Sequence, residues 1–235
     1  LNGKTDMFWE DQGKNKAVTF SYDDGTVYDV RLIELLNKYS LKSTFNLSFE
    51  RLSEKRDSRF IGSYPKVCRD DVKSIYEGHE VAVHTLNHVH LTECEDKEVI
   101  RQVENDRQRL SALAGYEVVG MAYPYGDFDD RVVELIKNKT GIRYSRTVRT
   151  TKNFHLQSNL LRFDPTVFHL RFEKMMSLAH EFIDLEAETP EIFYIFGHSY
   201  ELGEDENNWK LLEEFFEFIS KRDDIFYGTN REVLL

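Results

Sequence analysis

Short apolar runs alternate with longer amphipathic segments along most of the chain. The apolar runs are rich in Val, Ile, Phe and Tyr, which is typical of buried β-strands. They predict strands over residues 16–22, 43–48, 80–83, 117–122, 141–145 and 191–196.

The longer segments place apolar residues at the spacing of a helix with one buried face, as Leu32, Ile33 and Leu36 do. They predict helices over residues 30–41, 70–77, 96–114, 130–139, 172–185 and 208–220. Residues 51–64 are charged and aperiodic, so we expect a loop there. Residues 150–169 are aromatic and polar without clear periodicity, and we expect a long loop over a cleft that contacts substrate.

Alternation of strands and helices through short connections favours parallel strands joined by helical crossovers. The fold class is therefore α/β, and the pattern leaves two architectures open, an α/β barrel and a doubly wound sheet. The 235 residues contain no repeat, no low-complexity segment and no Pro- or Gly-rich linker. We predict a single domain over residues 1–235, because this length suffices for one sizeable core.

The charge of the chain narrows the class of partner. The formal net charge is −11, from 42 acidic residues against 31 Lys and Arg. This charge opposes docking on nucleic acid or on an anionic membrane, but it is compatible with a neutral glycan. No apolar run reaches the ~18 residues that a membrane-spanning helix needs, so we expect no membrane span.

The cysteines and the first residues of the chain bear on the cellular location of the protein. Cys68 and Cys94 are too few for a disulfide framework and lack the spacing of a zinc or redox motif, so we expect two unpaired thiols. Residues 1–11 are polar and show no signal-peptide pattern. Because the first residue is Leu rather than Met, a removed export signal stays open, and both a cytoplasmic and a secreted location fit the sequence.

Polar residues with catalytic chemistry follow several predicted strands. The carboxyl ends of parallel strands lie on one face of such a fold, which is where active sites form. The residues at these ends are Asp23, Asp24 and Gly25 after the first strand, His84 and His88 after the third, Pro124 and Tyr125 after the fourth, and His198 after the last. We therefore expect them to converge on one site.

One carboxylate and two histidines at i and i+4 form a ligand set for a divalent first-row metal. We expect Asp24, His84 and His88 to bind zinc, with cobalt, nickel and manganese as alternatives, and to leave a coordination position open for water or a carbonyl oxygen. The adjacent Asp23 could act as general base, and His198 as the acid that protonates the leaving group.

The order and spacing of these residues resemble the motifs of a known enzyme family. Residues 18–25 (Val-Thr-Phe-Ser-Tyr-Asp-Asp-Gly) resemble the first motif of the polysaccharide deacetylase family, also called NodB-homology or carbohydrate esterase family 4. Residues 84–88 (His-Thr-Leu-Asn-His) resemble its second motif, residues 122–126 (Ala-Tyr-Pro-Tyr-Gly) its third, and residues 196–198 (Phe-Gly-His) its last. The resemblance extends over residues 16–200.

The resemblance implies an incomplete (distorted) parallel β/α barrel, a bound divalent metal, and hydrolysis of an acetyl amide or ester. It assigns a role to each matching residue. Carried over in this way, Asp24, His84 and His88 hold the metal, Asp23 is the base, His198 is the acid, the backbone N–H of Tyr125 after Pro124 binds the oxyanion, and the Thr85 hydroxyl supports the histidine loop.

Two departures separate this chain from the family pattern. Ala122 stands where many members have an arginine, and the acidic, Trp-containing fourth motif is not evident. Arg146 is a candidate replacement for that guanidinium and Glu201 a candidate to orient His198, with an ordinary surface ion pair as the alternative for both. Without the neighbouring arginine, we expect Asp23 to hold its proton more tightly than in typical members.

Five further histidines have no motif partner, and we interpret them as structural or surface residues. They are His79, His90, His155, His169 and His180.

The predicted function is hydrolysis of N- or O-acetyl groups on a carbohydrate by metal-activated water. Acetylated xylan, a chitin-type glycan and a peptidoglycan-type glycan all fit as the acetylated partner. Two alternatives stay open, a hydrolase of a non-sugar amide on the same scaffold and a non-catalytic glycan-binding protein that retains the metal. The sequence leaves the sugar, the choice between amide and ester, the metal and the oligomeric state open.

Overall fold

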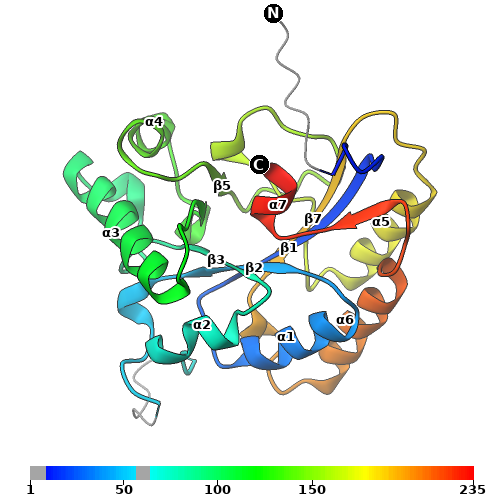
Figure 1. Cartoon of the computed structure of the whole chain (residues 1–235), viewed down its shortest axis with the longest axis horizontal. Helices are drawn as coiled ribbons and strands as arrows, with labels where there is room; N and C mark the ends of the chain where they lie inside the picture. Colours follow the sequence, from blue (N-terminus) through cyan, green and yellow to red (C-terminus); the bar gives the residue numbers. More distant parts are fainter. Residues whose placement is uncertain (1–8, 57–63) are drawn as a thin grey trace, which may run out of the picture.

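A parallel sheet curls into an incomplete α/β barrel, and helices lie along the outside of the curve (Figure 1). The computed structural model describes residues 9–56 and 64–235 of the chain. The strands are β1 (Lys16–Asp23), β2 (Ser43–Leu47), β3 (Glu80–Val83), β4 (Gly120–Ala122), β5 (Tyr144–Arg146), β6 (Val167–Phe168), β7 (Glu191–Gly197) and β8 (Ile225–Tyr227). The helices are α1 (Tyr28–Lys38), α2 (Val72–Ile75), α3 (Asp96–Ala114), α4 (Asp130–Lys139), α5 (Phe172–Asp184), α6 (Glu206–Ile219) and α7 (Asn230–Leu234).

The strand β1 is the centre of the sheet. The strand order is β5-β4-β3-β2-β1-β7-β6, and every pairing is parallel. β7 pairs with β1 along residues 16–22, while on the other edge β8 pairs with residues 16–18 and β2 with residues 20–23. Because one face of β1 looks into the barrel and the other is covered by helices, every residue of the strand is buried.

The outer helices each bury one apolar face against the sheet. In α3 the buried residues include Val99, Val103 and Leu110, which recur at helical spacing, and the helix ends at Gly115 in the left-handed conformation (φ 82°). None of the helices in the described ranges is long and apolar enough to cross a membrane.

The structure confirms the predicted strands and helices, with shifted ends. The fourth and fifth strands begin at Gly120 and Tyr144, later than the pattern indicated. The strands β6 and β8 and the helix α7 lie outside every predicted element, because two to five residues are too few to show a period. The curled sheet decides for the barrel over the doubly wound alternative. Cys68 and Cys94 are both free thiols, as predicted.

Residues 150–169 are largely irregular, as predicted, but two short regular elements and a buried residue tie the segment to the sheet. This segment contains the 3₁₀ turn η5 (Leu160–Arg162) and the strand β6. Phe163 is buried, and its backbone exchanges hydrogen bonds with Ser145 and Thr147 along β5, at 3.0 and 2.9 Å. The segment therefore packs against the sheet, and its aromatic residues serve the core.

A buried carboxylate ties the C-terminal helix to the amino ends of the strands. Glu80, at the start of β3, accepts hydrogen bonds from the Thr44 hydroxyl (2.6 Å), the Tyr144 hydroxyl (2.9 Å) and the backbone N–H of Arg231 (2.9 Å). The backbone N–H of Asn230 in turn donates to the Thr44 hydroxyl at 2.8 Å. Strands β2, β3 and β5 are thus joined to α7 through one side chain.

We predict that Glu80→Ala lowers the free energy of unfolding by about 2–4 kcal/mol, because it leaves buried donors without an acceptor. Urea unfolding of the metal-free protein measures the loss. The control is Glu77→Ala, since Glu77 is exposed on the same segment. Equal unfolding midpoints for the two variants would contradict this account.

Candidate active site

The candidate site lies at the carboxyl ends of the strands, where four loops meet. β1 ends in Asp23 and Asp24, and the loop after β3 carries the two motif histidines. The 3₁₀ turn η4 (Pro124–Gly126) follows β4, and the 3₁₀ turn η6 (Ser199–Glu201) follows His198 at the end of β7. The predicted convergence of strand ends is therefore present.

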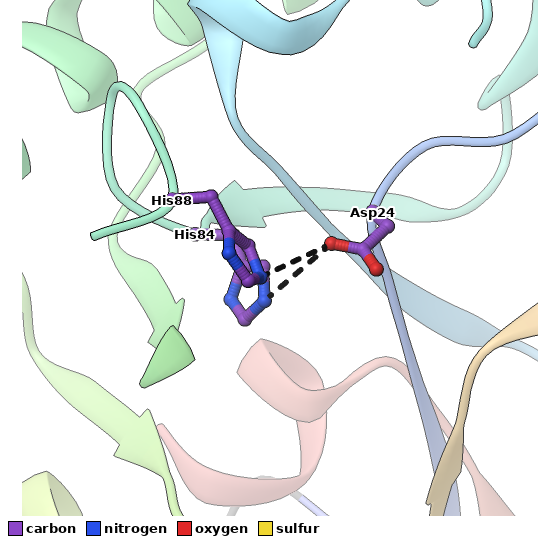
Figure 2. Close-up of side chains that lie close together, drawn as sticks. All are labelled: Asp24, His84 and His88. Atoms are coloured by element: carbon purple, nitrogen blue, oxygen red, sulfur yellow. Dashed lines mark ion pairs between the residues drawn. The ribbon is translucent and has the colours of Figure 1, made fainter. Parts of the chain in front are cut away.

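One carboxylate and two imidazoles face one another at the centre of the site (Figure 2). Asp24 Oδ1 lies 3.4 Å from His88 Nε2 and 3.8 Å from His84 Nε2. The ligand atoms of the three residues all lie within 4.8 Å of one another. Donor atoms bound at ~2 Å in a tetrahedral arrangement around one ion are ~3.3 Å apart, so the spacing of this trio suits a single first-row metal.

The protonation of the two histidines also fits a metal. His84 Nδ1 lies 2.8 Å from the Ala122 carbonyl oxygen, which can only accept, so Nδ1 donates and Nε2 presents its lone pair to the trio. Burial, together with the neighbouring His84, lowers the pKa of His88 to about 4. His88 is therefore available as a neutral ligand at pH 7, and His84 turns Nε2 toward the trio.

Backbone strain gathers at these residues. Asp24, Thr85, His88 and Tyr125 all have φ between 57° and 83°, the left-handed region that non-glycine residues rarely adopt. Such conformations cost about 1 kcal/mol or more each and persist where the surrounding structure holds them. The Thr85 hydroxyl helps to hold the histidine loop, since it accepts from the backbone N–H of Val89 at 3.2 Å.

Two side chains of α3 anchor the histidine loop from behind. The buried Asp106 carboxylate accepts from the backbone N–H of His84 at 3.2 Å and from that of Phe49 at 2.8 Å. Gln102 exchanges two hydrogen bonds with Asn87, both at 2.9 Å. The long helix thereby fixes the loop that carries both histidines.

Asp23 lies beside the trio with its carboxylate firmly held. Its Oδ1 accepts from Asn46 at 2.9 Å, and its Oδ2 from the Arg146 guanidinium at 2.5 Å. Burial disfavours the ionised carboxylate, but Arg146 and the two nearby histidines, His84 and His198, outweigh it and lower the pKa of Asp23 to about 2. Asp23 is therefore ionised across the neutral range.

His198 faces both acids from the opposite wall. Its Nε2 lies 3.9 Å from Asp23 Oδ2 and 3.9 Å from Asp24 Oδ2. Its Nδ1 lies 3.1 Å from Glu201 Oε1. Burial disfavours the imidazolium, but Glu201 and Asp23 outweigh it and raise the pKa of His198 above its usual value.

An exposed aromatic ring borders the trio on a third side. The Tyr125 ring is 59% exposed and lies edge-on to His88, with ring centroids 4.6 Å apart. One of its faces stacks on His90 at a centroid distance of 3.9 Å and an interplanar angle of 8°. His90 thus supports the Tyr125 ring as a flat aromatic surface beside the site.

Comparison with known proteins assigns the chain to a family. A model of the polysaccharide deacetylases matches residues 10–145, more than half of the chain. The chain belongs to the polysaccharide deacetylase family. Its relatives include the peptidoglycan-N-acetylmuramic acid deacetylase PdaC of Bacillus subtilis, 24% identical over 124 residues, 52% of this chain and 24% of that protein. The chitooligosaccharide deacetylase of Sinorhizobium fredii is 29% identical over 129 residues, 52% of this chain and 53% of that protein.

The chain thus spans about a quarter to a half of the length of these relatives. Solved structures extend the likeness to nearly the whole chain. The Xyl-CE4 domain of a multidomain xylanase from the hindgut metagenome of Trinervitermes trinervoides has a TM-score of 0.63 at 13% identity, over 93% of this chain and 89% of that one. A CE4 family pseudoenzyme from Bacillus anthracis has a TM-score of 0.56 at 19% identity, over 94% and 66%. These similarities establish the deacetylase fold.

Within this deacetylase domain, the strand register explains how Arg146 reaches the acid. Ala122 in β4 is the direct register partner of Arg146 in β5. This chain therefore places its guanidinium on the neighbouring strand β5, at the same level as position 122. Arg146 is completely buried, which excludes the ordinary surface ion pair. The expectation that Asp23 holds its proton more tightly than in typical members assumed no neighbouring guanidinium, but Arg146 lies beside Asp23 and lowers its pKa.

The sequence analysis missed one residue of this candidate site. His169 follows β6 and is completely buried, and its Nε2 lies 2.8 Å from Glu201 Oε2. Its position at a strand end was the available signal, but the strand was too short to be recognised.

A buried carboxylate, Asp29, anchors the turn η6 to α1. It accepts from the Ser199 hydroxyl at 2.5 Å and from the Tyr76 hydroxyl at 2.7 Å. Burial raises the pKa of Asp29 to about 7, although these hydrogen bonds and the nearby Lys66 oppose that shift and Asp24 adds to it.

We predict that breaking the Arg146 to Asp23 pair is far costlier than removing both partners. Arg146→Met leaves a buried carboxylate without its cation, which costs about 3–5 kcal/mol of unfolding free energy. The Asp23→Asn/Arg146→Met double variant should lose less than the sum of the single losses by ~1 kcal/mol or more. Chemical unfolding of the metal-free variants measures the cycle.

The control is the same cycle on an exposed ion pair, Arg31 with Glu206, whose charged atoms lie 2.7 Å apart. The coupling energy between Arg31→Met and Glu206→Gln should be less than ~1 kcal/mol. Additive losses at Arg146 and Asp23 would refute a mutually dependent buried pair.

We also predict a pH-dependent effect of Asp29→Asn on stability. In the unfolded chain an aspartate ionises near pH ~4, whereas folded Asp29 keeps its proton up to about pH 7. The contribution of Asp29 to the free energy of unfolding therefore falls as the pH rises through this window, and the variant gains stability relative to the original protein. Unfolding curves of the metal-free proteins at several pH values test this, with the exposed Asp223→Asn as control. Parallel pH dependences for original and variant would contradict it.

Proposed function

We propose that this family member is a metal-dependent carbohydrate deacetylase that hydrolyses an N- or O-acetyl group of a glycan. The observation that carries the proposal is a three-donor metal trio, Asp24, His84 and His88, flanked by an ionised carboxylate and an imidazole. This set of groups suits hydrolysis of an acyl group, which needs an electrophile, a base and an acid around one carbonyl.

The residues that would hold the metal are Asp24 and the Nε2 atoms of His84 and His88. When bound there, a divalent ion supplies a Lewis acid for water and for the acetyl carbonyl. Zinc is the first expectation, and cobalt, nickel and manganese accept the same nitrogen and oxygen donors.

Asp23 is the proposed proton acceptor for the attacking water. Arg146 and Asn46 hold its carboxylate in one orientation, which spares the reaction the entropy of arranging it. Its lowered pKa keeps it ionised at neutral pH, the form that can accept a proton.

His198 is the proposed general acid. Its raised pKa keeps a larger share of the imidazolium at neutral pH, and Nε2 is the nitrogen that faces the site. It would protonate the leaving amine of an acetamide or the leaving alcohol of an acetyl ester. The backbone N–H of Tyr125 is the proposed donor to the oxyanion, which the family resemblance also assigns.

A carbohydrate substrate is supported by the relatives and by the surface around the trio. The related proteins are named as deacetylases of peptidoglycan and of chitooligosaccharides. The exposed Tyr125 ring, stacked on His90, offers an apolar plate on which a sugar ring can lie. The net charge of −11 favours a neutral glycan over an anionic one.

The test is release of acetate from acetylated xylo-oligosaccharides, chito-oligosaccharides and peptidoglycan fragments by metal-stripped protein, before and after zinc or cobalt is added. We expect release only with metal. Asp24→Ala should lose metal binding and activity together, whereas Asp23→Asn should keep the metal and lower kcat by about 10²–10⁴-fold. The control is His155→Gln, which removes an exposed histidine outside the trio.

The outcomes separate the alternatives. A protein that binds no metal overturns the proposal outright. Metal binding without acetate release from any glycan points to a non-catalytic member, a state represented among its structural neighbours by the Bacillus anthracis pseudoenzyme. Hydrolysis of small amides alone would place the activity outside carbohydrates.

A further inference from the structure

We propose that His169 is a positioning residue for His198 and acts through the Glu201 carboxylate. The side chains of His169, Glu201 and His198 together form what we call the acid array. The inference rests on the proposed function, in which His198 donates a proton to the leaving group.

The fold brings the acid array together from neighbouring strand ends. His169 directly follows β6, and His198 directly follows β7. These strands pair in parallel, with Phe168 opposite Phe196, so both histidines emerge side by side. Glu201 closes the 3₁₀ turn η6 and comes back between them.

The Glu201 carboxylate has contacts on both oxygens. Oε2 lies 2.8 Å from His169 Nε2 and accepts from the backbone N–H of His198 at 3.0 Å, while Oε1 lies 3.1 Å from His198 Nδ1. Burial disfavours the ionised form, but the hydrogen bonds from His169 and His198 outweigh it and lower the pKa of Glu201 to about 2. His198 Nδ1 faces Oε1 at ion-pair distance without a well-aligned hydrogen bond. Because an ionised carboxylate only accepts, Glu201 favours a proton on Nδ1, which leaves Nε2 facing the two acids.

The side chain of His169 is closely packed on the side away from Glu201. It is completely buried, and its ring packs edge-on against Tyr22 at a centroid distance of 5.3 Å. A Cβ added to Gly197 would lie 2.1 Å from the His169 ring, so the glycine before His198 is the residue that leaves room for it. Burial lowers the pKa of His169, which keeps the ring neutral and its Nε2 a hydrogen-bond donor.

The bonding of His169 distinguishes positioning from simple packing. Its Nδ1 is buried and has no hydrogen-bond partner in the described structure. The cost of that unpaired nitrogen is offset by the hydrogen bond that Nε2 donates to Glu201. The turn η6 has a separate anchor, since the Ser199 hydroxyl donates to Asp29 at 2.5 Å and lies 2.9 Å from the Thr26 hydroxyl. His169 is therefore not required to build the turn, and its contact acts on the Glu201 side chain.

The test compares His169→Leu, which removes the donor, with His169→Gln, whose amide nitrogen reaches a place similar to Nε2. With metal-loaded protein we expect His169→Leu to lower kcat by about 10- to 100-fold with KM and metal content unchanged, because a displaced acid acts mainly in the transition state. His169→Gln should recover most of that loss. The control is His79→Leu, which removes a buried histidine bonded to Ser43 and Asn37 at the amino ends of the strands and should lower stability alone.

A second readout does not depend on activity. Ring-nitrogen NMR of the metal-free protein should show His198 as the Nδ1-protonated neutral tautomer, and His169→Leu should mix the two tautomers. An original protein that releases no acetate would defeat the proposed function and leave this readout intact. A kcat and a His198 tautomer both unchanged in His169→Leu would overturn the positioning role, as would equal kcat losses in His169→Leu and His79→Leu.

Discussion

A buried guanidinium holds the site together electrostatically. Asp23 and Asp24 are adjacent carboxylates at the end of one strand, and Asp23 is 3% exposed. Two carboxylates this close, with little water around them, would drive one of them to take up a proton. Arg146 supplies a fixed opposite charge at 2.5 Å, so Asp23 stays ionised and Asp24 is left free to face the histidines.

On the side of His198, a fixed carboxylate likewise stabilises the charge of a neighbouring group. Glu201 lies between His198 and His169, and its charge favours the protonated form of the imidazole that faces the site. Each charged group near the trio therefore has a partner fixed by packing. Arg146 is held in the core, and His169 is held against Gly197. Such prior arrangement is what makes polar groups effective in a buried site, because little reorganises during the reaction.

The strained backbone at the site is stabilised from outside it. Asp24, Thr85 and His88 adopt left-handed conformations, and hydrogen bonds from neighbouring elements hold the residues beside them. Asp106 and Gln102 of α3 bind the histidine loop, and Asn46 of β2 binds the end of β1. The outer helices thus stabilise ligand geometry as well as the core. In this member of the polysaccharide deacetylases, the departure at Ala122 is accompanied by a guanidinium from the adjacent strand.

Local pattern in the sequence was sufficient for most of the strands and helices and for the convergence of Asp24, His84 and His88. Apolar runs and helical spacing depend on burial of neighbouring residues, and the strand-end rule then places Asp24, His84 and His88 on one face. The tertiary structure alone decided which partners these residues meet. The contact of Arg146 with Asp23 depends on the register of β4 with β5, and the contact of His169 with Glu201 on the pairing of the two-residue strand β6 with β7. Registers are long-range properties, and the pKa of a buried carboxylate follows from the charges that they bring beside it. The sequence alone therefore did not decide which charge lies beside Asp23.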